Sequence, residues 1–132
     1  CRIRYIINIR GDTLMSYKVV FYSYNDKMPM DEILEELSKN EKLEAKFFRE
    51  LELLQLFGHL EEPHVKALEN GIFELRIIQG NNHARTFFFY MVGKKIIMTH
   101  GFIKKTNKTP RAELNKALEY KKEFEGRKKN GL

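Results

Sequence analysis

The stretch IIMTHGFIKKTNKTP, residues 96–110, holds the pattern from which the fold and the function are predicted. In its first half Ile96, Met98, His100 and Phe102 alternate with other residues, so these four side chains are expected on one face of a strand. Its second half turns basic, with three lysines within five residues, and ends at a proline. A histidine within an apolar strand and ammonium groups at its end indicate that this strand has a functional role in addition to packing in the core.

The composition is typical of one soluble globular domain. The chain has 132 residues, of which 42% are hydrophobic and 32% are charged. A domain of this size can bury a hydrophobic core without disulfide bonds or bound metals to stabilise it. Its single cysteine, Cys1, excludes a disulfide framework and fits a reducing compartment, so we expect a cytoplasmic protein. The longest apolar run, TFFFYMV, is much shorter than a membrane span, so no membrane partner is expected.

Charge is distributed unevenly along the chain. The overall net charge of +6 combines a net charge of +3 over residues 1–25, −7 over Asp26–Glu74 and +10 over Leu75–Leu132. A basic segment of this kind predicts a polyanionic partner such as nucleic acid, and the alternative is a solvated basic face without a ligand.

The chain opens on Cys1, and its first methionine is Met15. The tripeptide RGD at residues 10–12 can be encoded by purine-rich codons that resemble a ribosome-binding sequence. We therefore expect the native start at Met15. The expected organisation is a translated leader or extension at 1–14, a single domain at 15–125, and a basic, flexible tail at 126–132.

Periodicity and turn residues predict seven elements. In chain order they are a strand over 17–23, a helix within 25–40, a longer helix over 41–57 that ends at Gly58, strands over 71–80 and 84–93, the strand from residue 96, and a helix that starts near Pro110. This order predicts an α+β domain whose sheet is antiparallel and has about four strands. Two N-terminal helices would pack on one face, and a C-terminal helix would follow the sheet. The run FFFY is apolar on both faces, which predicts a central strand.

Two arginines lie within apolar strands, where an unpaired cation is costly. They are Arg76 in FELRII and Arg85 in HARTF, and no acidic residue occurs between Leu75 and Arg111. We therefore expect Arg76, Arg85, Lys104, Lys105 and Lys108 to lack local partners and to attract an anion. Each residue also has a purely structural interpretation. Arg76 could pair with Glu74, His100 could be a satisfied core histidine, and the lysines could keep a strand end soluble.

The segments LEEPHVKALENGIFELRI, HARTFFFY and HGFIKKTNKTPRAELNKALEY resemble the phage-derived HigB-like toxins of the RelE/ParE superfamily. These proteins are the toxins of type II toxin–antitoxin systems. The resemblance extends from about Tyr17 to Phe124, and HGFIKKT followed by a proline-led helix is its most specific part. It implies a RelE/ParE-like fold and a ribosome-dependent mRNA endonuclease that inhibits translation without a metal or other cofactor.

The resemblance also implies roles for individual residues. Catalysis by attack of the RNA 2′-hydroxyl on the adjacent phosphate needs a proton acceptor, cations for the phosphate and a proton donor. The expected catalytic residues are Arg76, Arg85, His100 and Lys104. The expected RNA-binding residues are Lys105, Lys108, Arg111, Lys94, Lys95, Tyr90 and Phe102. Glu74 and Glu62 are further candidates for the base.

The same resemblance implies partners and leaves alternatives. The expected partners are a cognate helix-turn-helix antitoxin, the ribosome with its mRNA, and DNA only indirectly, through the antitoxin complex. ParE-like relatives poison DNA gyrase with the same fold, so a gyrase inhibitor is the first alternative. The second is an RNA-binding phage accessory protein without catalysis. A zinc site at His59 and His64 is not expected from their spacing.

Overall fold

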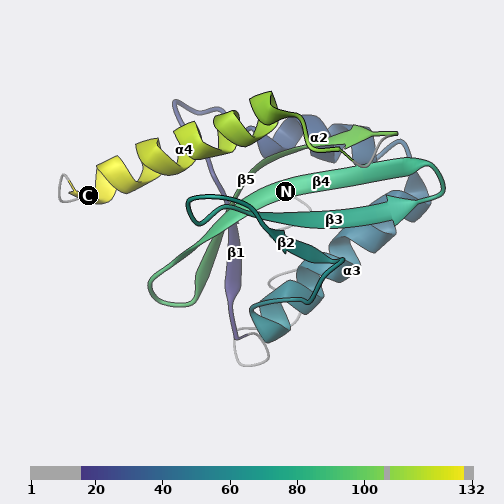
Figure 1. Cartoon of the computed structure of the whole chain (residues 1–132), viewed down its shortest axis with the longest axis horizontal. Helices are drawn as coiled ribbons and strands as arrows, with labels where there is room; N and C mark the ends of the chain where they lie inside the picture. The colour runs from purple at the N-terminus through teal and green to yellow at the C-terminus, as the bar shows by residue number, and fades with distance from the viewer. Residues whose placement is uncertain (1–15, 106–107, 130–132) are drawn as a thin grey trace.

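The computed structural model describes residues 16–105 and 108–129, and the leader expected at 1–14 lies outside this part of the chain. The described residues form three helices and five strands (Figure 1). The strands are β1 (Lys18–Phe21), β2 (Val65–Ala67), β3 (Phe73–Gln79), β4 (Asn82–Met91) and β5 (Lys95–Lys104). The helices are α2 (Met30–Leu37), α3 (Glu41–Phe57) and α4 (Arg111–Lys129).

The strands form one mixed sheet in the order β1-β5-β4-β3-β2. The β3–β4–β5 meander is antiparallel as predicted, but β1 pairs with β5 in parallel, with Val19 opposite Ile96. The prediction of an antiparallel sheet of about four strands is therefore wrong in two respects, because β2 adds a fifth strand and β1 is parallel. β4 occupies the central position, as its apolar run predicted.

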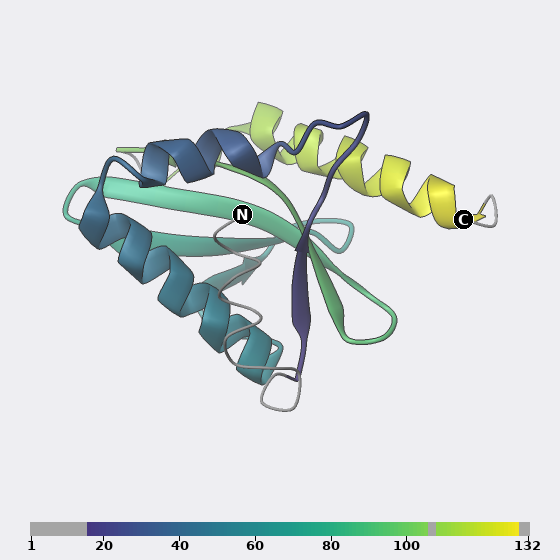
Figure 2. The same cartoon turned by 180° about the vertical axis from the view of Figure 1, so that it is seen from behind.

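Helices cover the two faces of the sheet unequally. α2 and α3 lie on one face (Figure 2), where Leu43, Phe47, Leu51 and Leu54 of α3 pack with Phe88 of β4 in a fully buried cluster. α4 packs on the other face, where Leu114 and Ala117 contact Phe87, Phe89 and their neighbours in a second cluster. α4 covers only one end of this face.

Both ends of α3 agree with the sequence prediction. The Asn40 side chain accepts a hydrogen bond from the backbone N–H of Leu43, which caps the first turn. Gly58 ends the helix with a φ of 79°, a left-handed conformation that glycine adopts without a steric penalty. α3 therefore supports the sheet along its length.

A β-bulge changes which side chains β5 presents to each face. On β4, Thr86 and Phe88 pair with Gly101 and Met98, so Thr99 and His100 together lie opposite the single residue Phe87. Ile96 and Met98 therefore belong to the cluster under α2 and α3, whereas His100 and Phe102 face α4. The prediction that all four lie on one face is wrong, because the extra residue reverses the alternation.

α4 begins directly after Pro110, as expected, and runs further than the boundary placed at residue 125. Residues 126–129 of the expected tail are helical, and Arg127 donates a 2.6 Å hydrogen bond to the carbonyl of Ser23. None of the described helices has the length and apolar character needed to span a membrane.

Candidate functional site

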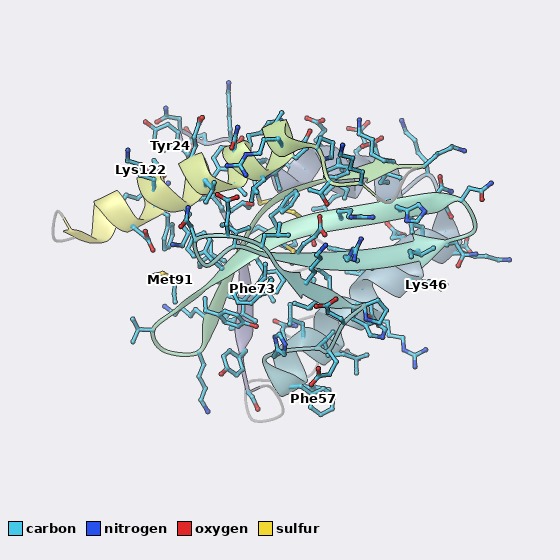
Figure 3. All side chains as sticks on the ribbon, in the orientation of Figure 1. Tyr24, Lys46, Phe57, Phe73, Met91 and Lys122 are labelled. Atoms are coloured by element: carbon cyan, nitrogen blue, oxygen red, sulfur yellow. The ribbon has the colours of Figure 1, made fainter. Side chains whose placement is uncertain are left out.

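The candidate site lies on the face of the sheet that α4 covers only in part. Figure 3 views this face, with α3 behind the sheet. Strand pairing arranges its side chains in rows across β3, β4 and β5. Arg76 lies opposite Arg85, and Arg85 lies opposite Phe102. Two guanidinium groups therefore lie side by side on neighbouring strands, because the pairing register brings residues 76 and 85 together.

Glu74 lies at the centre of this arrangement and has no exposed side-chain surface. Its Oε1 is 3.4 Å from Nη1 of Arg85 and 3.4 Å from Nε of Arg76. The Thr109 hydroxyl donates a 2.5 Å hydrogen bond to Oε2 of Glu74 and accepts one of 3.0 Å from Arg85. The expectation that Arg76 and Arg85 lack a local partner is wrong, because Glu74 precedes the acid-free stretch and points into it.

The two arginines differ in their access to solvent. The Arg85 side chain is 2% exposed and the Arg76 side chain is 22% exposed. Burial lowers the pKa of Arg85, an effect that the charge of Glu74 opposes. Among the described residues, both guanidinium groups contact the same carboxylate, that of Glu74. Of the two arginines, Arg76 is the one that an anion in solvent can reach.

Three lysines extend the positive charge beyond the arginines. Lys104 ends β5 and places its Nζ 6.0 Å from the centre of the Phe102 ring, and Lys105 and Lys108 are both exposed. Lys108 immediately precedes Thr109, whose hydroxyl reaches Glu74. We refer to Arg76, Lys104, Lys105 and Lys108 as the basic face.

His100 is buried on the same face, beside the basic face. Its Nε2 is 3.1 Å from Oε1 of Glu113 in α4, its Nδ1 is 3.2 Å from the Thr99 hydroxyl, and its ring stacks on Phe87 at 5.0 Å. Burial lowers the pKa of His100 to about 4, against the opposing charge of Glu113. The imidazole is therefore neutral at neutral pH. Both of its ring nitrogens have partners, so its contacts agree with the structural interpretation of His100 as a satisfied core histidine.

A cavity of about 500 Å³ opens beside His100, between the start of α2 and the start of α4. It is lined by Asp26, Lys27, Met28, Pro29, Asp31, Glu32, His100, Gly101, Phe102, Glu113, Lys116 and Tyr120. Acidic side chains outnumber basic ones in this lining, so the negative charge of an RNA backbone fits the basic face better than it fits the cavity. Among residues 16–105 and 108–129, no three His, Cys, Asp or Glu side chains are placed to share a metal ion.

Several predicted site residues lie elsewhere. Lys94 is in the β4–β5 turn and Lys95 is the first residue of β5, about 30 Å along the strand from Lys104. Tyr90 is on the face covered by α3, and its hydroxyl donates a 2.7 Å hydrogen bond to the carbonyl of Gly58. Arg111 is exposed at the start of α4 and pairs with Glu69. The structure therefore does not bring these four residues to the basic face.

Sequence reasoning missed two residues that organise the site, Thr109 as the bridge to Glu74 and Glu113 as the partner of His100. Thr109 immediately precedes Pro110, near which the C-terminal helix was predicted to start. Glu113 is the first acidic residue after Glu74, which is the one signal that could have identified it. Glu62, proposed as a possible base, is exposed in the loop before β2.

Residues 32–122 match the family described as "Phage derived protein Gp49-like (DUF891)", and this segment contains the whole basic face. The chain belongs to this family. It is also 34% identical over 67 residues to proteins named "Probable endoribonuclease HigB1" from two strains of Mycobacterium tuberculosis, CDC 1551/Oshkosh and ATCC 25618/H37Rv. That match covers 51% of this chain and 53% of each relative, so the chain spans about half the length of these relatives. The resemblance to phage-derived HigB-like proteins is confirmed.

Proposed function

We propose that this protein is the toxin of a type II toxin–antitoxin system and that it cleaves mRNA on the ribosome. The proposal is supported by the Gp49-like family and by the similarity to proteins named as probable HigB endoribonucleases. The observation that carries it is the basic face, where the partly exposed Arg76 and three exposed lysines lie near one another.

The proposed reaction is an internal transesterification of the RNA. The 2′-hydroxyl loses its proton and its oxygen attacks the adjacent phosphorus, and the bond from phosphorus to the 5′-oxygen breaks. The leaving 5′-oxygen takes up a proton, so the products are a 2′,3′-cyclic phosphate and a 5′-hydroxyl end. Negative charge builds up on the phosphoryl oxygens during attack, and fixed cations lower the barrier by stabilising it.

The proposed roles differ for the two arginines. Arg76 reaches solvent, and its planar guanidinium suits two phosphoryl oxygens at once. Lys104, Lys105 and Lys108 would follow the RNA backbone on either side. Arg85 is buried behind Arg76 and binds Glu74 and Thr109, so we assign it a positioning role.

His100 and Glu113 form the proposed proton-handling pair. The neutral imidazole can accept a proton, and the carboxylate of Glu113 next to it would stabilise the resulting cation. β3 and β5 are two strand spacings apart, about 10 Å, so a phosphodiester held by Arg76 can extend toward this pair.

The proposed partner that silences the toxin is a helix-turn-helix antitoxin encoded beside it. The complex of the two would bind operator DNA, so DNA contact by this chain would be indirect. Recovery of the product of the adjacent gene with a tagged form of this chain tests the partner, and its absence from the complex would argue against this part of the proposal.

The nuclease proposal is tested by expressing the chain in cells and mapping mRNA 5′ ends. Cleavage phased with codons and ending in 5′-hydroxyls is expected for the native chain, and Arg76→Gln should reduce it by about 100-fold or more. Arg49→Gln, which removes an exposed arginine of α3, is the matched control and should leave cleavage unchanged. Intact mRNA together with linearised plasmid would instead indicate a gyrase poison and would overturn the proposal.

A further inference from the structure

The outer edge of β3 is only partly covered by another strand. β2 has three residues and pairs with Phe73–Leu75, whereas β3 continues to Gln79. The N–H of Arg76 points outward, because it donates a 2.8 Å hydrogen bond to the carbonyl of His64. Ile78 is two residues further along, so its backbone groups point the same way. The Ile78 N–H has no hydrogen-bond partner within residues 16–105 and 108–129.

A groove lies beside this open edge, between β3 and α3. Its volume is about 470 Å³, and its lining is Lys46, Arg49, Glu50, Leu53, Pro63, His64, Arg76, Ile77 and Ile78. The Ile78 side chain is 51% exposed, in keeping with its place on the open edge of β3. Lys46 reaches across and donates a 2.9 Å hydrogen bond to the Ile78 carbonyl. The edge therefore combines a free backbone donor with an apolar recess.

The charge around the groove is positive, although the groove lies in the acidic half of the chain. Lys46, Arg49 and Arg76 line it, and the single carboxylate in the lining, Glu50, is 2.7 Å from the His64 ring. Arg49 is exposed and has no ion pair within the described residues. The groove therefore favours an acidic occupant.

We infer that this edge binds a short extended segment of a partner protein, which adds a sixth strand beside β3. One apolar side chain of the segment would enter the groove, and acidic side chains beside it would meet Lys46 and Arg49. The inference deepens the proposed antitoxin partnership, on which the identity of the partner rests. An antitoxin bound here would meet Arg76, the member of the basic face that also lines the groove, and would leave Lys104, Lys105 and Lys108 two strands away uncovered.

Two other occupants fit less well. A second copy of the chain paired edge to edge through a two-fold axis would bring Arg49 and Lys46 of both copies together, and like charges in this position repel. A nucleic acid has no row of backbone donors and acceptors that could continue a β-sheet. An acidic peptide satisfies both the backbone edge and the charge.

The experiment uses the full chain, labelled with ¹⁵N, and a capped peptide of sequence Gly-Glu-Val-Glu-Ile-Asp-Gly. Saturable binding at a peptide concentration of about 1 mM should slow hydrogen exchange of the Ile78 amide about tenfold. Arg49→Glu should weaken binding about tenfold, and Lys39→Glu, a charge reversal in the turn between α2 and α3, should leave it unchanged. A peptide with N-methyl groups on alternate residues, which cannot continue the ladder, should lose the Ile78 protection.

Three results would overturn the inference. They are no saturable protection of Ile78, equal binding by the N-methylated peptide, and chemical-shift changes confined to Lys104, Lys105 and Lys108. Arg49→Glu should still cleave mRNA, so failure of docking and failure of the nuclease are distinguishable. If the peptide protects Ile78 but the chain does not cleave mRNA, the docking inference stands and the nuclease proposal is overturned.

Discussion

The carboxylate of Glu74 interacts with Arg85, Arg76 and Thr109 and has no contact with water. A buried pair of this kind contributes little net stability against an apolar replacement, but removing one partner leaves a desolvated charge. Glu74 therefore offsets the cost of placing two cations within the sheet, and Arg76 remains accessible to solvent.

Glu74→Gln should destabilise the fold by about 3 kcal/mol, because it keeps the shape of the side chain and removes the charge that Arg85 needs. Urea unfolding at pH 7 measures this. Glu36→Gln on the exposed side of α2 is the matched control and should change the free energy of unfolding by less than about 0.5 kcal/mol. Equal effects of the two substitutions would show that Glu74 does not neutralise the arginines.

His100 should make the stability depend on pH. Its pKa is about 4 in the fold and 6.5 as an ordinary histidine, so between these values the unfolded chain binds a proton that the fold excludes. The free energy of unfolding should therefore fall as the pH drops from about 6.5 to about 4, by on the order of 3 kcal/mol from this group.

The measurement is urea unfolding across this pH range for the native chain, His100→Gln and His59→Gln. The His100 variant should lose less stability on acidification than the native chain, whereas substitution of the exposed His59 should leave the loss unchanged. Identical pH profiles for all three proteins would contradict the assignment.

At the scale of elements, the close approach of β5 to β4 depends on Gly101. A Cβ at this position would lie 2.7 Å from Cγ2 of Thr86 and 2.8 Å from Cδ1 of Ile33, and it would also meet the backbone oxygen of Arg85. Both strands and α2 converge here, next to the bulge that turns His100 toward α4.

Gly101→Ala should destabilise the fold by about 2 kcal/mol, because a methyl group cannot fit without moving β5 away from β4. The urea midpoint reports the change. Gly126→Ala is the control, since nothing lies within 4 Å of its added Cβ in α4, and it should be neutral or stabilising by up to about 1 kcal/mol. If Gly101→Ala did not change the free energy of unfolding, β4 and β5 would have room for a methyl group at this point.

Much of the element pattern could be predicted because it depends on short-range periodicity. Leu43, Phe47, Leu51 and Leu54 recur at helical spacing, and all four are buried in α3. Three-residue β2 and the bulge could not be predicted, because both depend on how distant segments pair. The arginine row has the same cause. It depends on the register between β3 and β4, and the sequence shows only that each strand contains one cation.

At the scale of the whole molecule, the basic half of the chain does not form one surface. Lys95 and Lys104 lie at opposite ends of β5, about 30 Å apart. If RNA binds at the basic face, only lysines near Lys104 contribute to its contacts with phosphates.

The salt dependence of RNA binding should distinguish the two ends of β5. For single-stranded RNA followed by fluorescence anisotropy, Lys104→Gln should reduce the slope of log affinity against log salt by about 0.7. Lys95→Gln, the same change at the other end of the strand, should leave the slope unaltered. Equal changes for both variants would place the RNA along the whole strand.

Alone, the sequence determined the helices, the central apolar strand, the division into acidic and basic halves and the family resemblance, because each depends on residue types and their spacing along the chain. Only the tertiary structure decided that Glu74 neutralises the arginines, that His100 is buried against Glu113, and that Lys94, Lys95 and Tyr90 lie away from the basic face. The physical reason is that strand register and a single extra residue in β5 determine which side chains meet, and both are set by packing between segments far apart in the chain.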